Sequence, residues 1–90
     1  MSLFKNKFSS IFELPEEVLM DFPLIMLVGS SKLYIENHKG ISLYQPDLIK
    51  IRITPGLFIL HGSEMEIDEL ESNKLFISGQ ITEFKIKQVD

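Results

Sequence analysis

The stretch Ile49-Lys50-Ile51-Arg52-Ile53 alternates without a break between isoleucine and a cation. Successive side chains of a β-strand point to opposite faces, so the pattern places the three isoleucines on one face and both cations on the other. The sequence therefore predicts a half-buried strand here, with one face on a hydrophobic core and the other in water.

A turn follows this strand at residues 54–56, where proline fixes one φ angle and glycine supplies a positive one. Frequent turn signals of this kind separate short apolar segments from Pro23 onward, a spacing typical of a sandwich, barrel or roll. We expect a mainly β fold, a small antiparallel β-sandwich or roll of about eight short strands; a closed barrel or a solenoid-like β-roll is the alternative. The candidate strands are residues 24–28, 32–36, 41–44, 49–53, 57–60, 64–68, 75–79 and 83–87.

The chain before Pro23 has a helical pattern instead. Apolar residues recur there at spacings of three and four, which places them on one face of a short helix. Proline disfavours helix at the residue before it, so the helical segment ends at about residue 22. We expect one domain over residues 1–90, with a helical N-terminal segment (1–22) and a β domain (23–90). The apolar helical face consists of Leu3, Phe4, Phe8, Ile11 and Phe12.

Composition excludes several classes of protein. The chain has no cysteine, so it has neither disulfides nor thiolate metal sites. Its net charge of −4, with nine Lys and Arg scattered among thirteen Asp and Glu, disfavours nucleic acid as a partner. The longest apolar run, residues 24–28, is too short to span a membrane, and no secretory signal is apparent. We expect a cytoplasmic protein whose small core is stabilised by oligomerisation.

An acidic run follows residue 63, and its carboxylates could bind a hard cation such as calcium. The acids alternate with Met65 and Ile67, however, which is the pattern of a solvated strand face. The glycine and ligand spacing of an EF-hand loop are absent. We therefore interpret the run as a solvated face and predict no metal site. The acids are Glu64, Glu66, Asp68, Glu69 and Glu71.

The two histidines are weak candidates for chemistry. His38 lies near Glu36, which could orient it as a general base, but no nucleophile motif accompanies it. Asn37 and Gly40 favour a hairpin turn in this segment, because both tolerate positive φ. His61 lies in an apolar strand and is interpreted as a core or edge histidine. We expect no catalytic residues, no cofactor and no enzymatic activity.

Four large apolar residues fall at positions opposite the expected core face, namely Tyr34, Phe58, Leu60 and Phe76. Alternation from the presumed core residues of each strand gives this placement. The N-terminal helix could cover these residues, or they could form a subunit or partner interface. We expect them to be a candidate interface. The presumed core residues are Leu33, Ile35, Leu57, Ile59, Leu75 and Ile77.

Two further patterns leave alternatives open. Residues 57–62 resemble residues 75–79, which is consistent with either repeated hairpins or an internal repeat; repeated hairpins are the simpler interpretation. Residues 1–12 place Lys5 and Lys7 among apolar residues, as in a short helix on an anionic membrane surface. Such a helix would bind a membrane only weakly alone.

Several segments together resemble the YabP/YqfC family of sporulation proteins from endospore-forming Firmicutes, most closely its YqfC branch. The resemblance rests on residues 12–18, 21–25 and 28–29, and on the segment Leu33-Tyr34-Ile35-Glu36-Asn37-His38-Lys39-Gly40-Ile41. The resemblance implies a protein of the mother-cell compartment that acts beside a membrane-associated sporulation protein. It implies no catalytic activity and no cofactor. The family-signature turn comprises Glu36, Asn37, His38, Lys39 and Gly40.

Together these observations predict a non-enzymatic structural or interaction module of spore morphogenesis. We expect it to assemble with itself or with a membrane-associated sporulation protein, in the mother-cell cytoplasm or at the periphery of a membrane. A small-ligand or metal-binding β module is the alternative function.

Overall fold

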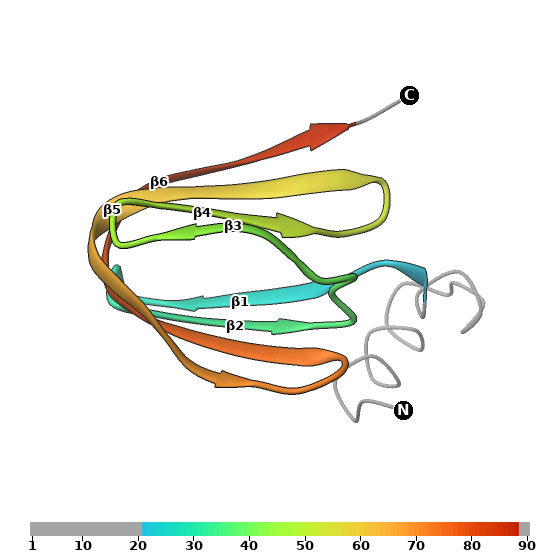
Figure 1. Ribbon diagram of the computed structural model, residues 1–90, viewed down its shortest axis with the longest axis horizontal. Coiled ribbons are helices and arrows are strands. Elements are labelled where there is room, and N and C mark those ends of the chain that lie inside the picture. Colours follow the sequence, from blue (N-terminus) through green and yellow to red (C-terminus); the bar gives the residue numbers. More distant parts are fainter. Residues whose placement is uncertain (1–20, 89–90) are drawn as a thin grey trace.

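The computed structural model describes residues 21–88, which form one antiparallel sheet of six strands (Figure 1). The strand order is β1-β2-β6-β5-β4-β3. The prediction of a mainly β, antiparallel fold is confirmed, whereas the expected number of eight strands is wrong. The predicted helical segment, residues 1–22, lies almost wholly outside the described residues. The strands are β1 (Leu24–Val28), β2 (Lys32–Glu36), β3 (Ile41–Gln45), β4 (Leu48–Arg52), β5 (Gly56–Leu70) and β6 (Lys74–Gln88).

The strand count falls from eight to six because β5 and β6 continue through a sharp bend. Their backbones cross closely there, at Gly62 and Gly79. A Cβ atom on Gly79, whose φ is +140°, would lie 2.6 Å from the Cα atom of Met65, and one on Gly62 would collide with the carbonyl of Gln80. The sequence interpretation ended candidate strands at or just before these glycines. They instead allow two strands to bend together without breaking their pairing.

The bend folds the sheet so that two halves face each other across the core (Figure 1). The β1 half contains β1, β2 and the start of β6; the β3 half contains β3, β4 and the start of β5. Side chains of both halves meet in one cluster, so each half has a core face and an outer face. The buried cluster consists of Leu33, Ile35, Ile49, Ile51, Ile53, Phe58, Leu60, Met65, Leu75, Ile77 and Ile81. The two segments that resemble each other are the starts of β5 and β6, each running into the bend.

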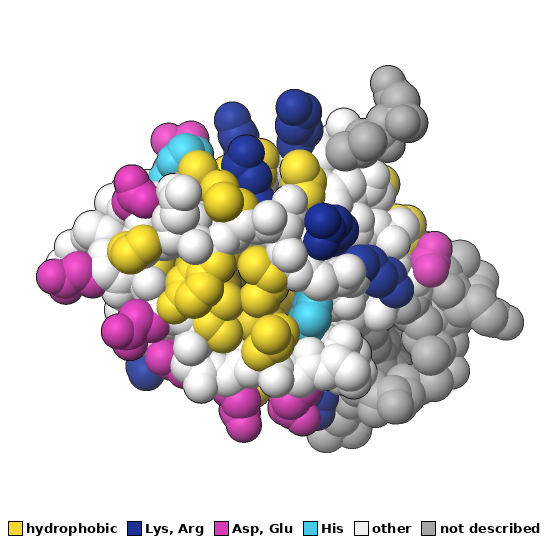
Figure 2. Space-filling view, viewed as in Figure 1, with side chains coloured by type: hydrophobic (Ala, Val, Ile, Leu, Met, Phe, Trp, Pro, Cys, Tyr) yellow, Lys and Arg dark blue, Asp and Glu magenta, His cyan; other side chains and the backbone are white. Residues whose placement is uncertain are grey.

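The sheet does not close. β1 and β3 end the strand order and do not pair with each other, so the closed barrel is wrong, as is the solenoid-like roll. A single side-chain bond joins β3 to the end of β5 among the hydrogen bonds of the described residues: the Ile67 backbone N–H donates to the Tyr44 hydroxyl at 3.0 Å. Figure 2 shows hydrophobic side chains in the middle of the molecular face, between the two halves. The buried cluster is covered, whereas Ile25, Ile41 and Ile67, which pack against it, are only partly buried.

Candidate functional site: the signature segment and an outer-face hollow

The signature segment, residues 36–40, connects β2 to β3, and these two strands lie far apart in the sheet. The sequence interpretation assigned it to a hairpin turn between neighbouring strands, which is wrong. The segment instead passes from the β1 half to the β3 half. Its backbone bends at Asn37, with φ of 64°, and at Gly40, with φ of 117°. Asparagine and glycine are the residues that adopt such angles at the least cost.

His38 is the centre of this connection and is buried, with 6% of its surface exposed. Its Nδ1 atom accepts a hydrogen bond from the Gly40 N–H at 3.1 Å, so the proton of the neutral ring resides on Nε2. Nε2 then donates to the backbone carbonyls of Glu71, at 3.0 Å, and Lys74, at 3.3 Å. Both ring nitrogens are therefore engaged by the backbone of this segment and of the β5–β6 turn.

Backbone bonds fasten the rest of the segment on two sides. The Asn37 N–H donates to the carbonyl of Asn73, in the β5–β6 turn. The Lys39 N–H donates to the Arg52 carbonyl at 2.7 Å, and the Arg52 N–H donates to the Gly40 carbonyl at 2.8 Å. The segment thus joins the β5–β6 turn of one half to the end of β4 in the other. This geometry accounts for Asn37, His38 and Gly40 of the segment.

The four candidate interface residues separate into two pairs. Phe58 and Leu60 are 1% and 0% exposed and belong to the core, so their assignment to an outer face is wrong. They lie opposite Ile51 and Ile49 of β4 in the strand register and therefore share the core face with them. Tyr34 and Phe76 do lie on the outer face of the β1 half, and both are half-buried.

Tyr34 and Phe76 are cross-strand partners, and their ring centroids are 4.7 Å apart. Met26 of β1 pairs with Tyr34, and Glu69 of β5 pairs with Phe76, so one row crosses four strands. Around this row the outer face forms an open hollow of about 410 Å³. The hollow is lined by Val28, Lys32, Leu33, Tyr34, Asp68, Glu69, Phe76 and Ile77.

The acidic side of this hollow was missed in the sequence interpretation, which treated residues 64–71 as a solvated face. Asp68 and Glu69 are exposed, yet they line the hollow beside the aromatic pair. Asp68 also accepts a hydrogen bond from the Ser78 hydroxyl at 2.9 Å, which holds its carboxylate against β6. A simple alternation could not have revealed this, because the register of β5 against β6 shifts at residues 63–66 and again at 67–69.

The Tyr34 hydroxyl links the hollow to the signature segment. Burial raises the pKa of the Tyr34 phenol, a hydrogen bond to the Glu36 side chain raises it further, and the negative charges of Glu36 and Glu71 add to the shift. Glu36 itself is 5% exposed. A neutral phenol can donate to the carboxylate, whereas an ionised one would face it as a second negative charge. The hydrogen bond between Tyr34 and Glu36 therefore restrains the hydroxyl end of the Tyr34 ring.

The remaining candidate residues for chemistry do not lie together in one site. Within residues 21–88, no three His, Asp or Glu side chains lie close enough together to bind a metal ion. His61 is half-buried on the outer face of the β3 half, opposite Leu48 and Glu83. In the same described range, no helix is long and apolar enough to cross a membrane. The proposed membrane-surface helix, residues 1–12, lies outside the described residues.

Fold and site together define a small, open-sheet β protein with an aromatic hollow on one outer face. The chain belongs to the YabP family, whose match covers residues 23–90, and this family is associated with sporulation. It is similar to the uncharacterized protein YqfC of Bacillus subtilis (strain 168), with 32% identity over 69 residues, which are 77% of this chain and 74% of that protein. No solved structure matches the chain significantly.

Proposed function

We propose that this protein is a non-enzymatic interaction module of spore morphogenesis that docks a segment of another protein in the outer-face hollow. Membership of the YabP family supports a role in spore morphogenesis, since this family is associated with sporulation. The Tyr34–Phe76 pair carries the proposal for the molecular act, because it places two aromatic rings 4.7 Å apart on a face that the core does not use.

The size and composition of the hollow suit a few side chains of a partner. Its volume of about 410 Å³ is near the lower end of known ligand pockets. Aromatic residues on an otherwise polar surface are the usual anchors of protein interfaces. Two carboxylates and a single lysine face the hollow, so its rim is negative on balance. We therefore propose an occupant that places an aromatic or aliphatic side chain next to an arginine or lysine.

The family resemblance supports a membrane-associated sporulation protein as the source of the docked segment. It also supports the mother-cell cytoplasm, at the periphery of a membrane, as the place of action. Self-association is the second mode of assembly that we propose.

A phage-displayed library of random peptides, panned on the full chain, tests the docking directly. We expect enriched peptides to combine an apolar or aromatic residue with a nearby cation. Phe76→Ala should weaken their binding by about tenfold or more, as truncation of a central aromatic anchor commonly does. Leu70→Ala is the matched control, because Leu70 is 55% exposed and lies outside the hollow.

Two results would contradict the docking proposal. One is the absence of any peptide that prefers the wild-type chain to the Phe76→Ala variant. The other is an equal loss of binding in the Leu70→Ala variant, which would mean that the peptides adhere to exposed apolar residues in general.

A further inference from the structure

The second half of β6, residues 82–88, is an edge strand. β2 pairs with β6 over Lys74–Ser78, and the N–H groups of Gly79 and Ile81 donate to the β1–β2 turn. Beyond that point β6 pairs with β5 alone among the strands of the described residues. Each of residues 82–88 is exposed, and Figure 1 shows this part of β6 along one margin of the molecule. Its outer backbone edge can therefore accept a further strand.

The core face of this edge strand is apolar but remains exposed. Phe84 and Ile86 lie opposite Leu60 and Phe58 in the register, so they point to the core side of the sheet. The ring of Phe84 lies 6.0 Å from that of Phe58. Yet Phe84 and Ile86 remain 55% and 54% exposed, whereas their partners are fully buried. Within residues 21–88, the apolar surface of the core thus continues from buried side chains of β5 onto exposed side chains of β6.

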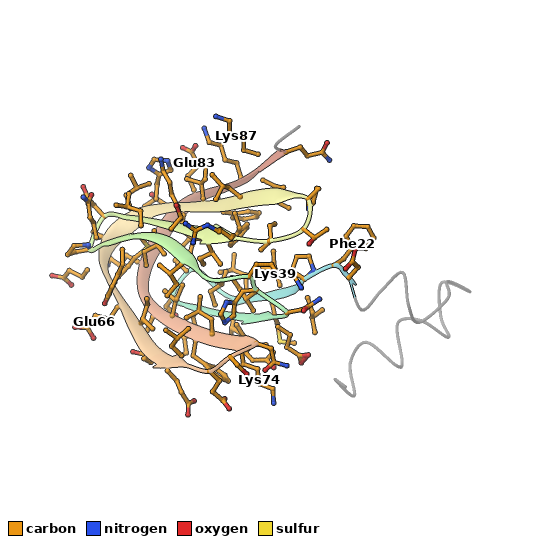
Figure 3. All side chains as sticks on the ribbon, turned by 45° about the vertical axis from the view of Figure 1, so that its right-hand side comes forward. Phe22, Lys39, Glu66, Lys74, Glu83 and Lys87 are labelled. Carbon is orange, nitrogen blue, oxygen red and sulfur yellow. The ribbon has the colours of Figure 1, made fainter. Side chains whose placement is uncertain are left out.

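The charges of the edge strand determine which occupant fits it. Glu83, Lys85 and Lys87 alternate with Phe84 and Ile86 and point to the outer face. Figure 3 shows Glu83 and Lys87 along the same margin of the molecule. If two copies of this strand pair antiparallel about Lys85, Glu83 of each copy lies opposite Lys87 of the other. In the same register Phe84 of each copy lies opposite Ile86 of the other. The strand is thus complementary to itself in both charge and apolar residues.

We propose that a second copy of this chain pairs with residues 82–88 and joins the two β3 halves into one continuous sheet. The proposal deepens the self-association put forward above and rests on it. The register is restricted, because a slip of one residue would place Phe84 opposite Lys85 and turn the apolar residues to opposite faces. A register centred on Phe84 would pair fewer residues of the strand.

The same register places Lys85 opposite Lys85 of the second copy. Like charges directly opposite each other weaken a strand pair. The two Glu83–Lys87 pairs oppose this repulsion, so the dimer is weak and reversible. Removal of the central charge by Lys85→Thr should therefore strengthen the dimer.

Charge reversal distinguishes this edge from other surfaces. Glu83→Lys and Lys87→Glu should each raise the dimer dissociation constant by about tenfold or more, because two cross-strand pairs change from unlike to like charge. The double variant has the net charge of the wild type and should restore dimerisation. Glu66→Lys, an exposed reversal on β5, is the matched control and should have no effect. Sedimentation equilibrium measures each constant; a double variant no better than the single ones would overturn the proposal.

Cysteine cross-linking tests the register itself, because the chain has no cysteine of its own. Lys85→Cys places two thiols at opposed positions, whose Cα atoms in an antiparallel pair are about 4.5–5.5 Å apart and within disulfide range. Lys87→Cys places them about 13 Å apart along the strands. We expect mild oxidation to give disulfide dimers of the first variant and not of the second. Equal cross-linking of both variants, or none with Lys85→Cys, would overturn the proposal.

Peptide binding in the hollow, measured on the same variants, separates the two proposals. If Lys85→Cys fails to cross-link while peptides still bind, the edge pairing is wrong and the docking proposal stands. If cross-linking follows the register while peptides do not bind, the edge pairing stands and the docking proposal fails.

Discussion

Residues 57–62 of β5 and residues 75–79 of β6 have nearly the same sequence, yet they turn their phenylalanines to opposite faces. Phe58 is 1% exposed in the core, whereas Phe76 lines the outer-face hollow. Strand pairing explains the difference. Phe58 lies opposite Ile51 of β4, on the core face, whereas Phe76 lies opposite Tyr34 of β2, on the outer face. The pairing partner, and not the similarity of the two segments, determines which face each side chain occupies.

The comparison predicts unequal costs for the same truncation. Phe58→Ala should lower the free energy of unfolding by about 3–5 kcal/mol, since it leaves a cavity in a fully buried cluster. Urea denaturation followed by circular dichroism measures the change, with Phe76→Ala as the matched control. A loss of less than about 1 kcal/mol for Phe58→Ala would place this residue outside the core, against its burial.

The same contrast holds for β2 and the segment that follows it: Tyr34 lines the hollow, whereas His38, four residues later, is buried. His38→Ala should cost about 2–4 kcal/mol of stability, because it leaves the Gly40 N–H and the carbonyls of Glu71 and Lys74 without this partner. Thermal unfolding should show a clearly lower Tm. His61→Ala, on a half-buried outer face, is the control and should cost under about 1 kcal/mol. Equal costs for the two histidines would refute the structural role of the signature segment.

Phe76→Ala should be the mild counterpart of Phe58→Ala. Phe76 is half-buried, so its truncation should lower the free energy of unfolding by about 1 kcal/mol. The Phe76→Ala variant should remain folded, with Phe58 still packed in the core, and should lose peptide binding in the hollow. A cost as large as that of Phe58→Ala would mean that Phe76 serves the fold instead of a partner.

The smallest effect concerns the Tyr34 phenol, whose pKa is raised by burial and by Glu36. Because the pKa in the folded state exceeds that in the unfolded state, the stability from the neutral phenol is complete below about pH 10 and declines as the pH rises further. Absorbance titration of the Tyr44→Phe variant, in which Tyr34 is the remaining tyrosine, should show ionisation above the usual range. Glu36→Gln should move the titration back toward that range. An unshifted titration of Tyr34 in the Tyr44→Phe variant would contradict the Tyr34–Glu36 contact.

Alternation along single strands predicted the β class and much of the core. Ile49, Ile51 and Ile53 are all buried, as their strict alternation with cations indicates. The same reasoning failed at Phe58 and Leu60, because residues 57–60 are apolar on both faces and alternation cannot choose between them. Their pairing with Ile51 and Ile49 of β4 decides the face. Close backbone approach between β5 and β6 is a tertiary fact, and no local pattern in either strand reveals it.

The signature segment shows a similar limit. Its Asn, His and Gly residues indicated a tight turn, and positive φ at Asn37 and Gly40 agrees with that. Sequence could not show that β2 and β3 lie in different halves of the sheet, so the burial of His38 against the β5–β6 turn was not foreseen. Of the four interface candidates, Tyr34 and Phe76 lie on the outer face as predicted, because the neighbours assumed to be core residues in their strands are indeed buried.

The central claim is that Tyr34 and Phe76 serve a partner in sporulation and not the fold. The most direct measurement is the number of heat-resistant spores formed by cells whose sole copy of this protein carries Phe76→Ser, compared with cells carrying Leu70→Ser. We expect few heat-resistant spores with Phe76→Ser, at a normal level of folded protein, and a normal number with Leu70→Ser. A normal number of spores with Phe76→Ser would contradict the claim.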